Sequence, residues 1–108
     1  MIKMTSEYCM IEVAFGKKYE LETSVKELLD KKLVSSCQVV ESSSTWNWQG
    51  EREAEKEYLV FLKTKKSLLE EIYETIRKIH SYDCFEFAIF DMTSTSSDYL
   101  NWIEKETK

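Results

Sequence analysis

The sequence is short of the residues that bend or free a chain, with no proline and two glycines in 108 residues. Because glycine is so rare, no glycine-rich loop is available to cradle a phosphate group. His80 is the only histidine, and one imidazole gives no clear set of nucleophile, base and acid. These shortages argue against an enzyme.

Cysteine and long apolar runs are also scarce. Cys9, Cys37 and Cys84 are odd in number and far apart, which favours reduced thiols over disulfides, a zinc knuckle or a redox motif. No apolar run approaches the roughly 20 residues of a membrane span, and the N-terminal stretch lacks the apolar centre of a signal peptide. We expect a cytoplasmic protein that neither crosses nor anchors in a membrane.

Positive charge is outweighed, since 15 basic and 20 acidic residues give a net charge of −5. A negative chain opposes the counterion release that drives most nucleic-acid binding, so DNA and RNA are not expected partners. The composition, 43% hydrophobic and 32% charged, is that of a globular protein. A chain of this length predicts a single domain over residues 1–108.

The first half of the chain alternates strand and helix patterns. Apolar residues recur at every second position from Tyr8 to Phe15, which predicts a strand. Ser24 to Glu27 has the spacing of a capping box and precedes a helical stripe that ends at Leu33. Ser36 to Trp48 returns to period two, and Gly50 is placed for a turn into Glu57–Lys63, so a long hairpin is expected.

The second half repeats this order. Ser67 to Glu70 offers a second capping box for a helix that ends near His80. Cys84 to Phe90 follows as a fourth strand, and Ser97 or Asp98 is placed to cap a short final helix. The resulting order is strand, helix, strand, strand, helix, strand, helix.

This order predicts an α+β protein of the ferredoxin-like type, with a four-stranded antiparallel sheet and both longer helices on one face. The strands Glu57–Lys63 and Cys84–Phe90 carry apolar side chains on both faces, so the uncovered face would expose an apolar patch. We therefore expect an oligomer. The alternative is that the final helix folds back over the open face.

The chain resembles the CutA divalent-cation tolerance proteins over roughly four fifths of its length. The segments that carry the resemblance are VKELLDKKLVSSC at 25–37, WNWQGEREAEKEYLVFLKT at 46–64, IHSYDCFE at 79–86 and SDYLNWI at 97–103. Together, in this order, they are specific. The resemblance implies a ferredoxin-like core and a homotrimer in which strands of neighbouring subunits pair and the sheets close around a shared interior.

The resemblance also implies that Trp46 and Trp48 form an aromatic pair that precedes the hairpin turn and packs at a subunit boundary. The alternative is a tryptophan pair folded onto its own hairpin. Family members usually carry prolines in the second strand, in the turn after the second helix and before the glutamate that follows. This chain has Ser81 and Phe85 at the last two places, so we expect lower rigidity without a change of fold.

In function, the resemblance implies tolerance or response to divalent metals, especially copper, without catalysis. The family's proposed ligands are a glutamate on the third strand, here Glu57, the histidine that closes the second helix, here His80, and a cysteine on the first strand, whose position is Ala14. Cys84 lies four residues from His80 and is the alternative thiolate, whereas Cys9 lies on the opposite face of its strand from Ala14. Cu(II) accepts imidazole ligands and Cu(I) accepts thiolate, so a bound copper ion is a chemically sensible cofactor, though none is required for folding.

Clefts between subunits near Lys63 and Tyr82 could hold a metal or small ligand. The alternative function is a signalling or scaffold trimer that binds a small anionic metabolite, by analogy with the nitrogen-regulatory PII proteins. Acylphosphatases share the fold but need an arginine after the first strand, where this chain has lysines. The acidic run from Glu51 to Glu57 is interpreted as a solvated face that could gather hard cations weakly.

Overall fold

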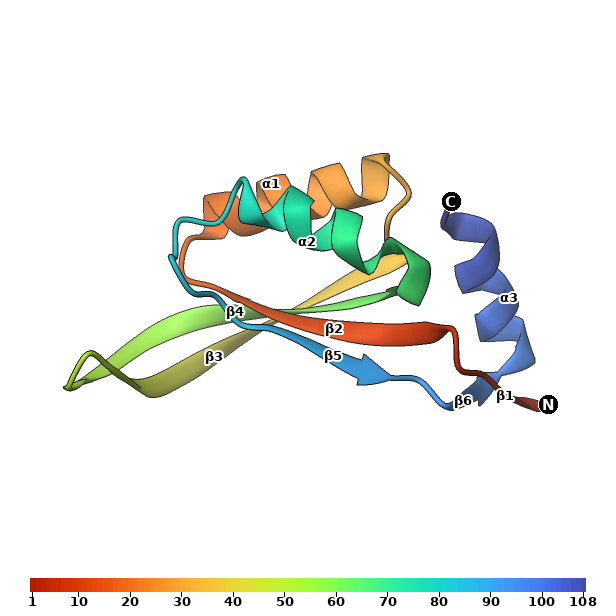
Figure 1. Ribbon diagram of the computed structural model, residues 1–108, viewed down its shortest axis with the longest axis horizontal. Coiled ribbons are helices and arrows are strands. Elements are labelled where there is room, and N and C mark those ends of the chain that lie inside the picture. Colours follow the sequence, from red (N-terminus) through yellow and green to blue (C-terminus); the bar gives the residue numbers. More distant parts are fainter.

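The computed structural model describes residues 1–108 and consists of two layers, a sheet and a pair of helices (Figure 1). The four-stranded antiparallel sheet has the order β3-β4-β2-β5. Its strands are β2 (Tyr8–Phe15), β3 (Ser36–Trp48), β4 (Glu51–Lys65) and β5 (Phe87–Asp91). The helices α1 (Lys18–Asp30) and α2 (Leu69–Arg77) both cover one face of this sheet (Figure 1). The prediction of an α+β fold with an antiparallel sheet is confirmed.

A second, two-stranded sheet lies at one end of the molecule and was not predicted from the sequence. It pairs β1 (Ile2–Met4) with β6 (Ser94–Ser96), and α3 (Ser97–Glu106) follows directly. Both strands have three residues, too short for an alternating pattern to be visible in the sequence.

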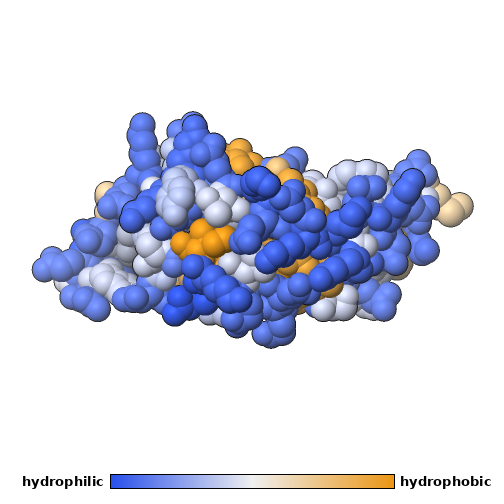
Figure 2. Space-filling view, turned by 90° about the horizontal axis from the view of Figure 1, so that it is seen from above, coloured by the Kyte–Doolittle hydropathy of each residue, from blue (hydrophilic) through white to orange (hydrophobic).

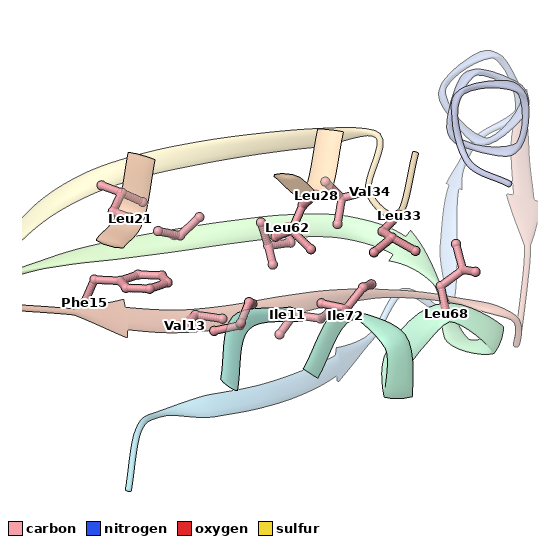
Figure 3. Packing of buried hydrophobic residues seen from close by; sticks show 12 residues of the cluster. Ile11, Val13, Phe15, Leu21, Leu28, Leu33, Val34, Leu62, Leu68 and Ile72 are labelled. Carbon is pink, nitrogen blue, oxygen red and sulfur yellow. The ribbon is translucent and has the colours of Figure 1, made fainter. Parts of the chain in front are cut away.

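The hydrophobic core fills the space between the helices and the sheet (Figure 3). Ile11, Val13 and Phe15 point from β2 toward the helices and are at most 1% exposed. Leu28 of α1 and Ile72 of α2 pack onto them from the other layer. Burying each such side chain stabilises the fold by about 1.5–3 kcal/mol. The packing of these side chains therefore fixes how the sheet lies against the two helices. Seen from the helix side, the surface is mainly hydrophilic with small hydrophobic patches (Figure 2).

Neither predicted capping box begins a helix. α1 begins at Lys18, and Ser24 lies inside it, 1% exposed, with a hydroxyl that has no hydrogen-bond partner. The helix starts earlier because Leu21 lies one turn before Val25 and extends the apolar stripe. A 3-10 turn, η1 (Lys66–Leu68), precedes α2, and Ser67 does not cap it. In α3 the cap is Ser96, whose Oγ accepts a hydrogen bond from the Tyr99 amide, and not the predicted Ser97 or Asp98.

The final helix leaves the second face of the main sheet open. α3 packs across the end of the sheet, where Leu100 and Ile103 contact Tyr8, and Figure 1 shows it at the end remote from the hairpin. Val40 and Phe90, which point to the open face, remain 50% and 48% exposed. The alternative, in which α3 folds back over this face, is wrong, because the apolar side chains of α3 pack at the end of the sheet.

The hairpin of β3 and β4 projects beyond both layers (Figure 1). We call its outer part, residues 42–57, the arm. The strands stay paired to the tip, where Trp48 lies opposite Glu51. Gln49 and Gly50 form the turn with φ values of 49° and 84°, the positive values that a tight hairpin turn demands and that glycine adopts freely. The arm therefore holds its shape through its own backbone hydrogen bonds.

None of the helices has the length and apolar character needed to cross a membrane.

Candidate functional site

His80 lies just after α2 and is buried between two aromatic rings. Its imidazole is stacked on Phe15 and on Phe85, with ring centroids 4.6 and 4.5 Å away. Nε2 lies 2.8 Å from the carbonyl oxygen of Ala14, and Nδ1 lies 3.2 Å from the amide nitrogen of Tyr82. Because the carbonyl can only accept and the amide can only donate, Nε2 carries the proton and Nδ1 accepts. Both ring nitrogens are thus engaged within the chain.

The turn after His80 is held by a buried carboxylate from α1. Glu20 is 5% exposed, and its Oε1 accepts hydrogen bonds from the amide of Ser81 at 3.0 Å and from its hydroxyl at 3.1 Å. A proline at this position could not donate the first bond. Ser81, at a position where the resemblance implies a proline, therefore restrains this turn through hydrogen bonds to Glu20, one of which proline could not make.

Tyr82 connects the turn to the base of the arm. Its hydroxyl donates to Oε2 of Glu57 at 3.2 Å, and its ring lies against Gly16, where an added Cβ would come within 2.2 Å of the hydroxyl oxygen. Burial, followed by the charges of Glu57 and other glutamates, raises the pKa of Tyr82 to about 12. Glu57 is 7% exposed and forms no ion pair. The base of the arm thus holds a buried carboxylate with no counter-charge.

A groove runs between the arm and the segment from Tyr82 to Glu86. It consists of two adjoining cavities of about 290 and 370 Å³, which share Trp46 and Cys84. The outer cavity is lined by Trp46, Trp48, Glu53, Glu55, Tyr82, Asp83 and Cys84. The inner cavity is lined by Ala14, Ser44, Thr45, Trp46, Glu57, Cys84 and Glu86. We refer to these two cavities together as the groove.

The predicted metal ligands are only partly brought together. Glu57 and Cys84 line the inner cavity together with Ala14, the family's cysteine position. His80 is not among the lining residues, and no three or more histidine, cysteine, aspartate or glutamate side chains are placed to hold a metal ion within the chain. The set His80, Glu57 and Cys84 therefore does not form a metal centre within one chain.

The two residues predicted to line a ligand cleft, Lys63 and Tyr82, also lie apart. Tyr82 lines the groove, but Lys63 lies further along β4, and its Nζ donates to Oε1 of Gln38 at 2.7 Å. Trp46 and Trp48 are on the groove side of the arm, with Trp48 43% exposed. Cys9 is fully buried, and this burial raises the pKa of its thiol to about 11, which makes it a poor ligand.

A carboxylate pair beside the groove was missed by the sequence analysis. A hydrogen bond with Glu12 of β2, together with burial and the charge of Glu12, raises the pKa of Glu86 to about 7. The two meet because Glu12 pairs with Ala88, so that Glu86 lies one pleat further along the same face. No signal in the sequence gives this register, since β5 begins only at Phe87.

The fold and groove define a small α+β protein with an antiparallel sheet, a projecting hairpin and a cluster of aromatic and acidic side chains at its base. The model of the CutA1 divalent ion tolerance protein family matches residues 9–106. The chain belongs to this family, which confirms the resemblance found in the sequence.

Individual relatives agree with this assignment. The divalent-cation tolerance protein CutA of Pyrococcus horikoshii is 36% identical over 87 residues, covering 81% of this chain and 85% of that protein. The chloroplastic protein CutA of Arabidopsis thaliana is 30% identical over 75% of this chain and 45% of its own length. A crystal structure of CutA1 from Pyrococcus horikoshii covers 100% of this chain and 99% of its own with a TM-score of 0.86 at 30% identity. CutA from Synechococcus elongatus, at 17% identity, shares the fold with a TM-score of 0.93 over 100% of this chain and 96% of its own.

Proposed function

We propose that this protein is a cytoplasmic, non-catalytic homotrimer that takes part in tolerance or response to divalent metal ions, copper among them. Metal tolerance at the level of the family follows from its membership, since the family carries that name. The trimer, the copper ion and the site between subunits are the proposal. The observation that carries it is the uncovered apolar face of the sheet, next to the groove.

The topology supports a ferredoxin-like domain. The order β3-β4-β2-β5 places the first and third strands of the main sheet at its centre and the second and fourth at its edges. This is the arrangement expected when two strand-helix-strand units interlock. Both edge strands have one free side in the chain, which leaves backbone donors and acceptors available for pairing with a neighbour.

The open face supports assembly. The side chains that point to it include Val40 of β3, Phe61 of β4 and Phe90 of β5; Val40 is paired with Leu59 and Phe90 with Met10, whereas Phe61 lies between Gln38 and Glu12. Large apolar side chains that remain about half exposed, as Val40 and Phe90 do, are costly to leave in water and are typical of an association surface when they gather on one face. A homotrimer would bury this face around a common interior and place Trp46 and Trp48 at the boundary between subunits.

A matched pair of variants tests the assembly. Phe90→Glu puts a charge on the open face, whereas Ile89→Glu puts it on the helix side of the same strand, where the side chain is 46% exposed. Light scattering across a dilution series should give a trimer for the wild-type chain and for Ile89→Glu, and a smaller species for Phe90→Glu. A wild-type chain that remains a monomer at all concentrations would contradict the proposal.

Direct metal binding would use the inner cavity, where Glu57 and Cys84 supply a carboxylate and a thiol. Carboxylate and thiolate suit different metals, and a third ligand would come from a neighbouring subunit. His80 can join this set only if one of its hydrogen bonds to Ala14 or Tyr82 is broken.

Calorimetric titration with Cu(II) and Zn(II) tests the site, with Glu57→Gln, Cys84→Ser and His80→Asn as variants. We expect the first two to weaken binding about tenfold or more, and His80→Asn to weaken it less. A wild-type affinity no tighter than about millimolar, the level of roughly −4 kcal/mol, would reject direct binding.

The alternative of a PII-like trimer for an anionic metabolite has less support. None of the residues that line the groove is a lysine or an arginine. Lys63, the cation expected in the cleft, lies away from the groove and is bound to Gln38. An anion in the groove would meet carboxylates at close range, which is repulsive.

A further inference from the structure

The arm separates its charges between two faces. Side chains alternate along a strand, and the register pairs Trp46 with Glu53 and Trp48 with Glu51. The glutamates at the odd positions from Glu51 to Glu57 therefore share a face with both tryptophans. Arg52 and Lys56 lie on the opposite face, where Nε of Arg52 donates to Oδ1 of Asn47 at 2.6 Å. The acidic run is thus not neutralised by its own basic residues.

The opposite wall of the groove adds more negative charge. Asp83 lines the outer cavity and supplies this charge, Glu86 lines the inner one but is only partly ionised near neutral pH because its pKa is raised to about 7, and no basic side chain lines either cavity. Glu57, 93% buried given its exposure of 7%, has a single side-chain hydrogen bond, from Tyr82, and no ion pair. A buried carboxylate without a counter-charge is unfavourable, so the site favours the entry of a cation.

Aromatic rings make the outer cavity better suited to an organic cation than to a metal ion. Trp46, Trp48 and Tyr82 line the outer cavity among its carboxylates. Indole and phenol faces attract ammonium groups and also cover apolar carbon, whereas a hydrated metal ion uses neither property well. The two cavities share Trp46 and Cys84, and their glutamates, Glu53 and Glu55 in the outer one and Glu57 in the inner one, follow one another along β4.

We propose that the groove binds an organic polycation of the linear polyamine class, with its ammonium groups on the glutamates and its methylene groups against the tryptophans. Glu53, Glu55 and Glu57 recur every second residue, about 7 Å apart along a strand, which is comparable to the separation of amino groups in such a chain. One chain supplies all the named contacts, so the binding of a polyamine does not require the trimer. The inference uses the proposed trimer in one respect, which is that a neighbouring subunit would cover the groove.

Calorimetric titration with spermidine tests the aromatic contact through a matched pair of variants. Trp48 and Trp102 are 43% and 42% exposed, and Trp102 lies on α3, away from the groove. Trp48→Ala should weaken spermidine binding about three- to fivefold, the size of an exposed cation–π contact, whereas Trp102→Ala should leave it unchanged. Equal effects of the two variants, or no binding by the wild-type chain, would overturn the proposal.

A second pair tests whether the location of the carboxylates matters. The double variant Glu53→Gln and Glu55→Gln removes two charges from the groove, and Glu70→Gln with Glu74→Gln removes two exposed charges from α2. The first should weaken binding about tenfold, in line with two charge contacts of somewhat under 1 kcal/mol each, and the second less than twofold. Equal losses would mean that only the net charge attracts the polyamine, which contradicts a site.

Competition with magnesium separates an organic cation from any cation. Mg²⁺ at the concentration of spermidine should not displace it, because the ion prefers water and has no apolar body for the tryptophans. Displacement by equimolar Mg²⁺ would overturn the proposal. A trimer that binds Zn(II) but not spermidine would contradict this inference alone, whereas a monomer that binds spermidine with the expected Trp48 dependence would contradict the proposed assembly alone.

Discussion

Replacing His80 with alanine should lower the free energy of unfolding, because the imidazole ring is part of the packed interior. The imidazole fills the space between Phe15 and Phe85 and bonds at both nitrogens. Removing a buried ring costs about 3–5 kcal/mol, and this figure already includes part of the stacking. The carbonyl of Ala14 and the amide of Tyr82 each lose a partner, at about 1 kcal/mol apiece. We expect a total loss of about 5–7 kcal/mol.

Urea unfolding at a fixed protein concentration, followed by circular dichroism, measures this loss. His80→Phe is the informative second variant, because it keeps the stacked ring and loses both hydrogen bonds, so about 2 kcal/mol should be lost. Lys78→Ala, an exposed neighbour on the same turn, should change the free energy of unfolding by less than about 0.5 kcal/mol. A loss below about 1 kcal/mol in His80→Ala, accompanied by a loss of metal affinity, would refute the structural role and restore His80 as a ligand.

Three further predictions follow from single features. Ser24→Ala should stabilise the protein by about 0.5–1 kcal/mol in the same urea assay. The reason is that the buried hydroxyl has no hydrogen-bond partner and that alanine is the better helix former. A destabilised variant would mean that the hydroxyl is hydrogen-bonded. Gly16→Ala should cost about 1–2 kcal/mol, because the new Cβ would meet Tyr82 and displace it from Glu57; thermal unfolding checks this, and an unchanged midpoint would contradict the packing. The raised pKa of Glu86, about 7, means that the folded state binds a proton more tightly than the unfolded state, so the free energy of unfolding should fall as pH rises from about 4.5 through 7. The fall should be about 1 kcal/mol after screening, and the variant Glu86→Gln should show a flatter profile over this range.

All four strands of the main sheet were predicted, but β4 begins at Glu51 and not at Glu57, and β5 begins at Phe87 and not at Cys84. Tyr8–Phe15 and Ser36–Trp48 were predicted with the bounds that the structure has. Helix starts were less predictable, since a capping box needs only two residue types at a fixed spacing, and this occurred by coincidence at Ser24. The apolar stripe reaching back to Leu21 was the stronger signal, because burial contributes more free energy than a cap.

The candidate site was only partly accessible from the sequence. The aromatic pair Trp46 and Trp48 and the acidic run were visible, but the side that each residue faces depends on the register of β3 and β4. The engagement of both nitrogens of His80 depends on Ala14, which is 66 residues away in the sequence. Sequence spacing cannot reveal such a contact, so a buried structural histidine resembles a ligand until the fold is known.

The arm has a consequence for how this kind of protein can diversify. Its outer residues contact little of the core cluster, so substitutions at positions such as Glu53 or Trp48 should cost little folding free energy. On the proposal that the groove binds a polyamine, stability and recognition are encoded by different residues of the same two strands. A chain with this architecture can change what it recognises by altering a few side chains on one face of the hairpin, while the sheet beneath keeps its sequence and shape.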